Sequence, residues 1–346
     1  MLVSDVSLIH HDFYRKVVEE FAQNLSSLNY EFSRAWYHLA SHDMGPASRC
    51  IGPFVPPPQS WQHPLPAPLP SDQLPNWDDV KKQILEVMRP ALPHPALTPD
   101  TDGKSLYYGA AFIKLAWQCA ATFRRTDYRG GCNGARVRIE PQASWPVNRG
   151  MDAVLKILEP VKKSYSTLSW ADLIVFASHV AIEDAAAAAA APGPNPFCPG
   201  RTDAPEDDVF DSLQVYEASH RRVISQTHSS QPIIGESATD MQYRDAADLL
   251  GLTLREMVAL HGRVRSSSLA LLQGYNGSWS QAAASFGNQF YVTLLAETWQ
   301  KVTIDGVPQY KASGKDMCNP ITTYVCTHAL LTPKRPPLFL QIHGAC

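Results

Sequence analysis

The sequence lacks long apolar runs and clusters of like charge. Of its 346 residues, 45% are hydrophobic and 18% are charged, and 30 basic against 33 acidic side chains leave a net charge of -3. No uncharged apolar run reaches the roughly 18 residues of a membrane-spanning helix, and no Lys/Arg-rich run suits nucleic acid or anionic lipid. The first twelve residues lack the basic head and apolar stretch of a signal peptide. We therefore expect a soluble intracellular protein, in the cytoplasm, that binds neither nucleic acid nor membranes.

Cysteine is sparse and unpatterned. The seven cysteines form no C-x-x-C pair and are odd in number, so we expect reduced thiols in a reducing compartment and no disulfide framework. Cys318 and Cys326 stand eight residues apart, which is a weak metal-binding signal, and the histidines are scattered without metal-ligand spacing. The sequence predicts no metal site.

Strand-like alternation is also scarce, and the best short candidate is 135–140. Helical periodicity fills most of the chain, over 14–40 (two helices broken near Ser26–Ser27), 78–88, 106–123, 151–165, 170–191, 240–265 and 288–302. Between 45 and 75 the density of prolines rules out both a helix and a central strand. We predict a mainly α fold with a proline-rich connector lying over its surface.

The helix around residue 114 carries the most informative side chains. Lys114, Trp117 and Gln118 stand at positions i, i+3 and i+4, so a cation, an indole and an amide share one helix face. Such a face can converge on a ligand. It is the first candidate site.

Several motifs around this helix resemble class I haem peroxidases and, among them, the bifunctional catalase-peroxidases. They occur in family order: Phe112 to Arg124, Arg129-Gly130-Gly131-Cys132-Asn133-Gly134-Ala135-Arg136, Ser144-Trp145-Pro146-Val147-Asn148, Ser169-Trp170-Ala171-Asp172, Pro199-Gly200-Arg201-Thr202-Asp203-Ala204 and Gly251-Leu252-Thr253. Catalase-peroxidases have two tandem peroxidase-like halves, of which the first holds haem b. The resemblance implies a haem-peroxidase-like helical domain and the family reaction, hydrogen peroxide decomposition and peroxide-dependent oxidation of donors.

The resemblance is closest to the second, haem-free half and the segment leading into it. It implies four parts: 1–52 as the end of the first half, 53–75 as the connector, 76–326 as the second peroxidase-like domain and 327–346 as an unassigned tail. The apolar helix faces of 1–52 would pack on a haem half that this chain does not contain. We therefore expect a homo-oligomer or a peroxidase-domain partner.

The distal positions depart from the family pattern. A haem peroxidase needs a base to move a peroxide proton and a guanidinium to stabilise the departing oxygen. The family supplies them as Arg-x-x-Trp-His, and here these positions are Lys114, Trp117 and Gln118. An amide is no base near neutral pH, and lysine lacks the planar fork of arginine. Asn148 resembles the asparagine that orients the missing histidine.

The proximal positions are depleted as well. The resemblance places the axial ligand at Val264 or Arg265 and its aspartate partner near Thr323, and none of these side chains suits the role. Trp279 resembles the proximal tryptophan, although a buried aromatic is more often part of a core. His261 is the weak alternative ligand and is more often a structural histidine. We expect no cofactor in this chain.

Three hypotheses for function follow. The first is a structural and supporting peroxidase-like domain without haem. The second is an active haem peroxidase, acting on hydrogen peroxide, that uses His261 on one side with Lys114 and Gln118 on the other. The third is a redox sensor that works through exposed thiols such as Cys346.

Overall fold

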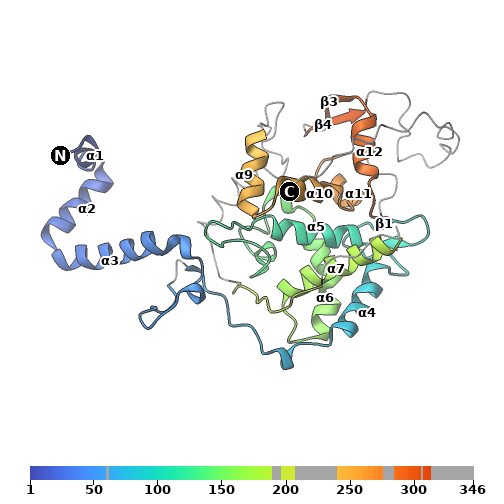
Figure 1. Ribbon diagram of the computed structural model, residues 1–346, viewed down its shortest axis with the longest axis horizontal. Coiled ribbons are helices and arrows are strands. Elements are labelled where there is room, and N and C mark those ends of the chain that lie inside the picture. Colours follow the sequence, from blue (N-terminus) through green and yellow to red (C-terminus); the bar gives the residue numbers. More distant parts are fainter. Residues whose placement is uncertain (60–61, 189–195, 207–239, 276–283, 305–306, 313–346) are drawn as a thin grey trace, which may run out of the picture.

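Eleven α-helices dominate the described part of the chain, and their order is shown in Figure 1. The computed structural model describes residues 1–59, 62–188, 196–206, 240–275, 284–304 and 307–312. The helices are α1 Val3–Ser7, α2 Asp12–Gln23, α3 Leu25–Ser41, α4 Trp77–Met88, α5 Gly109–Ala120, α6 Met151–Ser164, α7 Trp170–Ala188, α9 Asp240–Leu250, α10 Leu254–Ala259, α11 Ser267–Leu272 and α12 Gln289–Ala296. The strands are β1 Asp100–Thr101, β2 Leu106–Tyr107, β3 Trp299–Ile304 and β4 Val307–Ala312. The prediction of a mainly α fold is confirmed.

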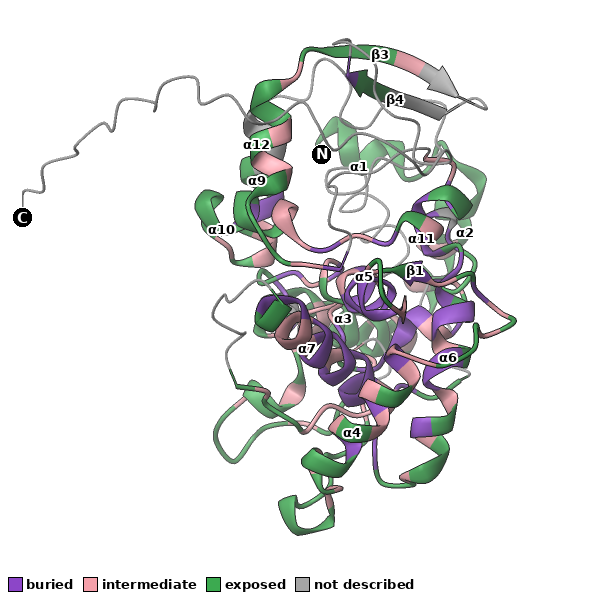
Figure 2. Cartoon of the chain, turned by 90° about the vertical axis from the view of Figure 1, so that its right-hand side faces the viewer, coloured by how far each residue is buried: buried purple, intermediate pink, exposed green. Residues whose placement is uncertain are grey.

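Helices α4 to α7 form the core. In α4, Asn76 caps the first turn by accepting from the Asp78 amide at 2.9 Å, and Val80, Ile84 and Met88 then fall on one buried face. Helices α5 and α7 are buried on almost every side and lie against each other (Figure 2). The apolar positions of these helices recur at helical spacing and face one another. For this reason the sequence predicted the ends of the helices to within a few residues.

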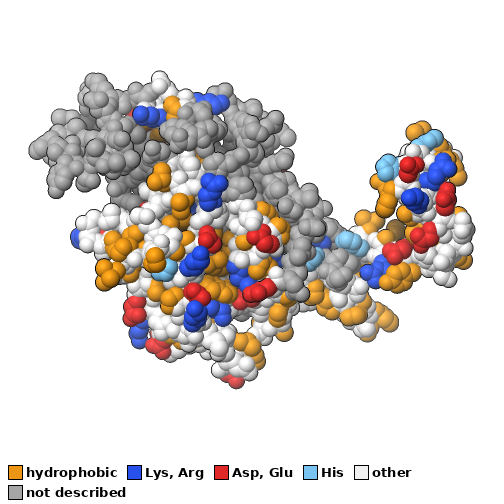
Figure 3. All heavy atoms as spheres, turned by 180° about the vertical axis from the view of Figure 1, so that it is seen from behind, with side chains coloured by type: hydrophobic (Ala, Val, Ile, Leu, Met, Phe, Trp, Pro, Cys, Tyr) orange, Lys and Arg blue, Asp and Glu red, His pale blue; other side chains and the backbone are white. Residues whose placement is uncertain are grey.

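Helices α1 to α3 form an arm that extends away from the helical body (Figure 1). Ser41, at its end, is the one buried residue of these helices, and apolar side chains such as Phe13, Phe32 and Trp36 are exposed. Figure 3 shows hydrophobic side chains on the surface of the arm. The break between α2 and α3 lies at Asn24, two residues before the predicted position. Asn24 accepts from the Ser27 amide at 3.0 Å and so caps α3.

One predicted element was wrong, and two predicted helical ranges are helical only in part. Residues 135–140 contain a 3-10 turn, Arg136–Arg138, because Ala135 takes a positive φ of 47° and turns the chain. The range 240–265 divides at Gly251, where Thr253 and Glu256 form a capping box that begins α10. The range 288–302 is helical only to Ala296, after which β3 pairs antiparallel with β4, Trp299 opposite Ala312.

The motifs that carry the family resemblance pair with one another. Asp203 accepts from the Trp170 and Ala171 amides, each at 2.9 Å, and so caps the first turn of α7. Asp172, in that turn, accepts from the Gly200 amide at 2.7 Å and from Arg201 at 3.0 Å. The segment around Arg201 and the start of α7 therefore hold each other in place.

The connector lies largely exposed along the body. Most of residues 53–75 are exposed, and the Leu65 side chain approaches Gly134 on the body. The division into 1–52, 53–75, 76–326 and 327–346 stays a prediction, and the last of these parts lies outside the described residues.

Candidate functional site

Helix α5 carries the three side chains that were predicted to share a face. Gln118 is buried, whereas Lys114 and Trp117 are half-buried. The rest of α5 is apolar and packs on α6 and α7, so the helix is fixed on the side away from these residues. The site therefore stands on a rigid element.

A buried amide cluster, made of Gln118, Gln142, Asn148 and Gln273, surrounds the end of α5. The Gln118 amide nitrogen donates to the Val147 carbonyl and, at 3.0 Å, to Asn148 Oδ1. Asn148 Nδ2 in turn donates to the main-chain carbonyl of Gln142 at 2.7 Å. The structure thus brings Gln118 and Asn148 together, as their spacing and the resemblance predicted.

Gln273, next to the end of α11, completes this cluster. Its Nε2 donates to the Val147 carbonyl at 2.9 Å, so this carbonyl accepts from two side chains. The cluster joins α5, the segment at 142–148 and α11. Its side chains are neutral amides, which donate and accept hydrogen bonds but do not take up a proton near neutral pH.

The indole of Trp117 is covered on one face by Arg263. The guanidinium carbon of Arg263 lies 4.4 Å from the ring centroid, within cation–π distance, and its Nη1 also donates to the Leu260 carbonyl at 2.9 Å. Arg263 comes from the segment just after α10. The segment that was predicted to carry an axial ligand therefore touches the predicted distal helix directly.

The predicted proximal positions lie in this same segment. Val264 is buried within the apolar core. Arg265 donates to the His261 carbonyl at 3.0 Å, and its guanidinium carbon lies 5.2 Å from the Phe290 ring centroid. Neither side chain is a ligand for iron, since valine has no donor atom and a guanidinium stays protonated.

His261 is the one imidazole at the predicted proximal positions. Its Nδ1 is 2.9 Å from the Met257 carbonyl, so this nitrogen carries the hydrogen and Nε2 has the lone pair. Burial lowers the pKa of His261, the hydrogen bond to Met257 acts in the opposite direction, and the nearby cations Arg263 and Arg265 lower the pKa further. Burial likewise lowers the pKa of both arginines.

Sequence reasoning missed three residues of this site and proposed two that cannot be placed. Arg263 and Gln273 had no motif to mark them, because their contacts join segments far apart in the chain. Gln142 takes part through its main-chain carbonyl, which a residue of any type can supply. Trp279 and Thr323 lie outside the described residues.

A disulfide joins Cys119 to Cys132, which corrects the prediction that the cysteines are all reduced thiols. Cys119 is in the last turn of α5, and the turn at Gly130 and Gly131, both with positive φ, brings Cys132 back to it. Their Cα atoms are 4.7 Å apart, within the range that a disulfide spans. Cys50 is free and half-buried and Cys198 is free and exposed, whereas Cys318, Cys326 and Cys346 lie outside the described residues.

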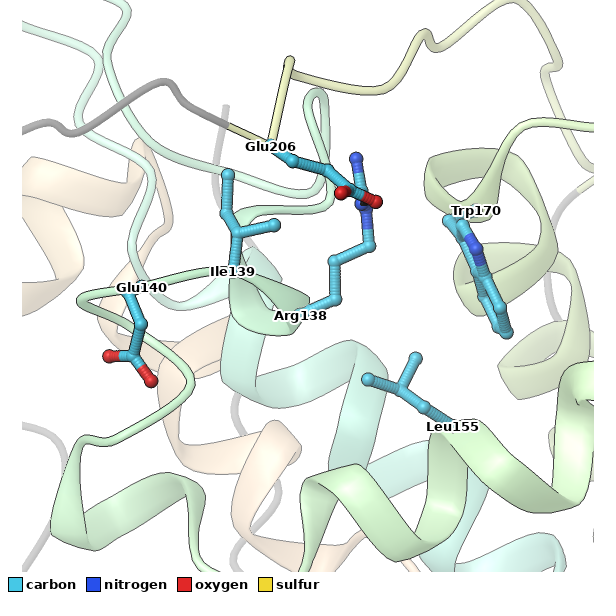
Figure 4. A pocket seen from close by; sticks show the side chains of 6 residues that line it. All are labelled: Arg138, Ile139, Glu140, Leu155, Trp170 and Glu206. Atoms are coloured by element: carbon cyan, nitrogen blue, oxygen red, sulfur yellow. Dashed lines mark ion pairs between the residues drawn. The ribbon is translucent and has the colours of Figure 1, made fainter.

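A shallow hollow of about 420 Å³ has no residue of the amide cluster in its lining (Figure 4). Arg138 and Trp170 face each other across it above Leu155, and the exposed Glu206 carboxylate lies 3.8 Å from Arg138 Nη1 at its rim. Within the described residues there is no group of three His, Cys, Asp or Glu side chains placed to hold a metal ion. Nor has any described helix the length and apolarity to cross a bilayer.

Comparison with known proteins agrees with these motifs. Residues 99–266 match the family model described as peroxidase. A catalase-peroxidase of Erwinia tasmaniensis is 35% identical over 300 residues, which are 85% of this chain and 38% of the relative. Catalase-peroxidases of Mycobacterium ulcerans and Serratia proteamaculans are each 33% identical, over 306 and 323 residues, which are 85% and 89% of this chain and 38% and 41% of the relatives. This chain therefore belongs to the peroxidase family and is related to one part of the longer catalase-peroxidases.

Proposed function

We propose that this chain is a peroxidase-like domain that binds no haem and supports a separate, haem-containing part of a catalase-peroxidase. The chain spans 38% to 41% of the length of the relatives named above, which leaves room for such a part in them. In this proposal the assembled protein decomposes hydrogen peroxide and oxidises donors with it. The chain described here supplies structure and contacts.

The contact between Arg263 and Trp117 carries the proposal. A haem peroxidase holds its haem between the distal side chains and the axial ligand. Here a side chain from the proximal segment lies 4.4 Å from the ring of the distal tryptophan position. This is close to van der Waals contact, so no porphyrin fits between the two groups at this point.

The donor set does not fit haem either. Gln118 offers an amide in place of a base, and its nitrogen is already bound to Val147 and Asn148. Val264 places an apolar side chain where an iron ligand would be needed. We derive no catalytic step from this site, because Gln118 is no base for proton transfer and Val264 is no ligand for iron.

The arm supports the proposed partner. Helices α1 to α3 bury almost nothing within this chain, and Phe32 and Trp36 stack on each other at a centroid distance of 6.1 Å on an exposed face. Apolar surface of this extent is typical of a protein contact. In the proposal the arm packs on the haem-containing part, and a second copy of the chain is the alternative occupant.

A haem titration tests the absence of haem. Hemin is added to the purified chain and to the variant Arg263→Gly/Val264→His, which removes the cover of Trp117 and adds an imidazole at the predicted ligand position. We expect no protein-bound Soret band with the native chain. A stoichiometric Soret band with the native chain would overturn the proposal.

The same titration tests the rival hypothesis of an active peroxidase. His261 favours it in one respect, because its imidazole lies in the predicted proximal segment and the contact of Nδ1 with the Met257 carbonyl orients the ring. If the native chain binds haem and His261→Ala abolishes the Soret band, His261 is the ligand. Peroxide-dependent oxidation of a phenolic donor then decides whether the complex is active.

A binding assay tests the supporting role. The part of the Erwinia tasmaniensis catalase-peroxidase that this chain does not cover is mixed with the full chain and analysed by size-exclusion chromatography. We expect a complex, and we expect Trp36→Asp to weaken it at least tenfold, whereas a change at exposed Lys156 on α6 leaves it unchanged. Failure of the native chain to bind, in any ratio, contradicts the proposed partner.

A further inference from the structure

The disulfide closes a loop between α5 and the glycine-rich segment. We call residues 119–132 the bridged loop. Both ends are buried, since Cys119 is 1% exposed and Cys132 is 7% exposed. No residue of the amide cluster lies in the bridged loop. The proposed absence of haem does not explain what the loop does.

Hydrogen bonds and ion pairs give the bridged loop a fixed shape. Arg124 pairs with the buried Asp127, and the Arg124 amide donates to the Arg129 carbonyl at 2.8 Å. At its base the Gly131 amide donates to Thr122 Oγ1 at 2.8 Å. These contacts present the tip of the loop, at Tyr128, in one orientation.

The tip of the bridged loop is where the segment after the arm rests. The Arg49 guanidinium carbon lies 3.8 Å from the centroid of the Tyr128 ring. Gly45 lies so close to the Tyr128 side chain that a Cβ atom at position 45 would be 2.9 Å from Tyr128 Cβ. Tyr128 itself has a φ of 58°, a conformation that is unfavourable for a bulky residue and needs support from its surroundings.

We propose that the Cys119–Cys132 disulfide is a redox-sensitive latch that holds the arm on the body through Tyr128. With the disulfide formed, the loop is short and closed, and Tyr128 is held under Arg49 and Gly45. With the disulfide reduced, the loop is free to relax from the unfavourable backbone at Tyr128, and the arm is released. The inference concerns the attachment of the arm and does not depend on whether the chain binds haem.

The chemistry of release is thiol–disulfide exchange with a dithiol. A thiolate of the dithiol attacks one sulfur, the S–S bond breaks, and the second thiol of the reagent closes its own disulfide. The protein gains two electrons and two protons and ends with two thiols, while the dithiol is oxidised. Because both sulfurs are buried, the reagent reaches them when the loop opens, so the reduction of the folded protein is slow.

Trypsin cleavage after Arg49 measures release of the arm directly. Trypsin must bind the Arg49 guanidinium in its specificity pocket, and this is the group that covers Tyr128 in the latched state. The experiment uses the full chain with Cys50→Ser and Cys198→Ser, so that no other free thiol of the described part can re-pair. The rate at Arg49 is followed by mass spectrometry before and after dithiothreitol. Cleavage within the core helix α6, at Lys156, is the internal control for global unfolding.

We expect reduction to raise the rate at Arg49 at least tenfold more than it raises the rate at Lys156, which reports the loss of global stability. Tyr128→Ala should give the same excess rate at Arg49 with the disulfide intact, and reduction should then add nothing to that excess. Mass spectrometry first confirms that reduction has produced two new thiols. If the cleavage rate at Arg49 is then unchanged, the latch is overturned. An equal rise at Lys156 also overturns it, because the disulfide would then stabilise the whole fold with no specific effect on the arm.

Discussion

Replacing Gln118 by leucine tests whether the amide cluster holds the fold together. Leucine has nearly the volume of glutamine, so the change removes hydrogen bonds without opening a large cavity. Two donations are lost, to Val147 and to Asn148, each worth about 1 kcal/mol net. Gln273 still donates to Val147, whereas Asn148 Oδ1 loses this donor in a buried position, which costs about 1 to 3 kcal/mol more. Together we expect a loss of about 3 to 5 kcal/mol in the free energy of unfolding.

Urea unfolding, followed by tryptophan fluorescence and circular dichroism, measures this loss. Gln273→Leu is the matched control, because it removes a donor from the same carbonyl but leaves that carbonyl bound to Gln118. We expect it to cost about 1 kcal/mol. In the double variant Gln118→Leu/Asn148→Leu, the loss in the free energy of unfolding should be less than the sum of the two single losses. Each single change already breaks the hydrogen bond between Gln118 and Asn148.

A cost below about 0.5 kcal/mol for Gln118→Leu would refute this reasoning, because surface substitutions without structural roles fall in that range. Additive effects of Gln118→Leu and Asn148→Leu would do the same. Either result would mean that the amide cluster does not tie α5 to the segment at 142–148.

Three further predictions concern catalysis, pH and the disulfide. Gln118→His with Lys114→Arg should restore no peroxidase turnover in a donor-oxidation assay with added hemin, because no axial ligand is supplied; turnover above the hemin blank would contradict this. The hydrogen bond and ion pair from Arg89, at 2.5 Å, hold the pKa of Asp102 well below its usual range, so the folded carboxylate contributes stability that is lost as pH falls below about 4. Asp102→Asn should therefore flatten the fall in melting temperature between pH 7 and pH 3, and an unchanged slope would argue against the ion pair. Replacing Cys119 and Cys132 by alanine reopens a short loop, which should lower the free energy of unfolding by about 3 kcal/mol in a urea titration; equal stability of both proteins would show that the disulfide adds nothing.

The sequence predicted the core helices well for a definite reason. In α4, α6 and α7 the apolar residues recur at helical spacing, and each helix is buried on the face that this spacing defines. The pairing of Gln118 with Asn148 was also predictable, because helix spacing and the resemblance pointed to the same place. Both inferences rest on local patterns.

The remaining features depend on contacts between distant segments. Arg263 reaches Trp117 because the chain turns after α10, and no local pattern encodes that turn's direction. Cys132 reaches Cys119 through two consecutive glycines with positive φ, and the spacing of the cysteines alone resembles that of unpaired thiols. The hairpin of β3 and β4 was missed because the apolar residues of 288–302 also fit a helical repeat.

The mutual capping of α7 and the Arg201 segment has a consequence for reading peroxidase sequences. The carboxylates of Asp203 and Asp172 accept hydrogen bonds from backbone amides and from Arg201. Both motifs therefore form a structural joint between α7 and the Arg201 segment. A chain can keep this joint, and match the peroxidase family through it, whatever side chains it has at the positions for proton transfer and iron ligation. Matches at these motifs thus report a shared scaffold. Inference of catalysis needs the side chains at 118 and 264 to be read individually.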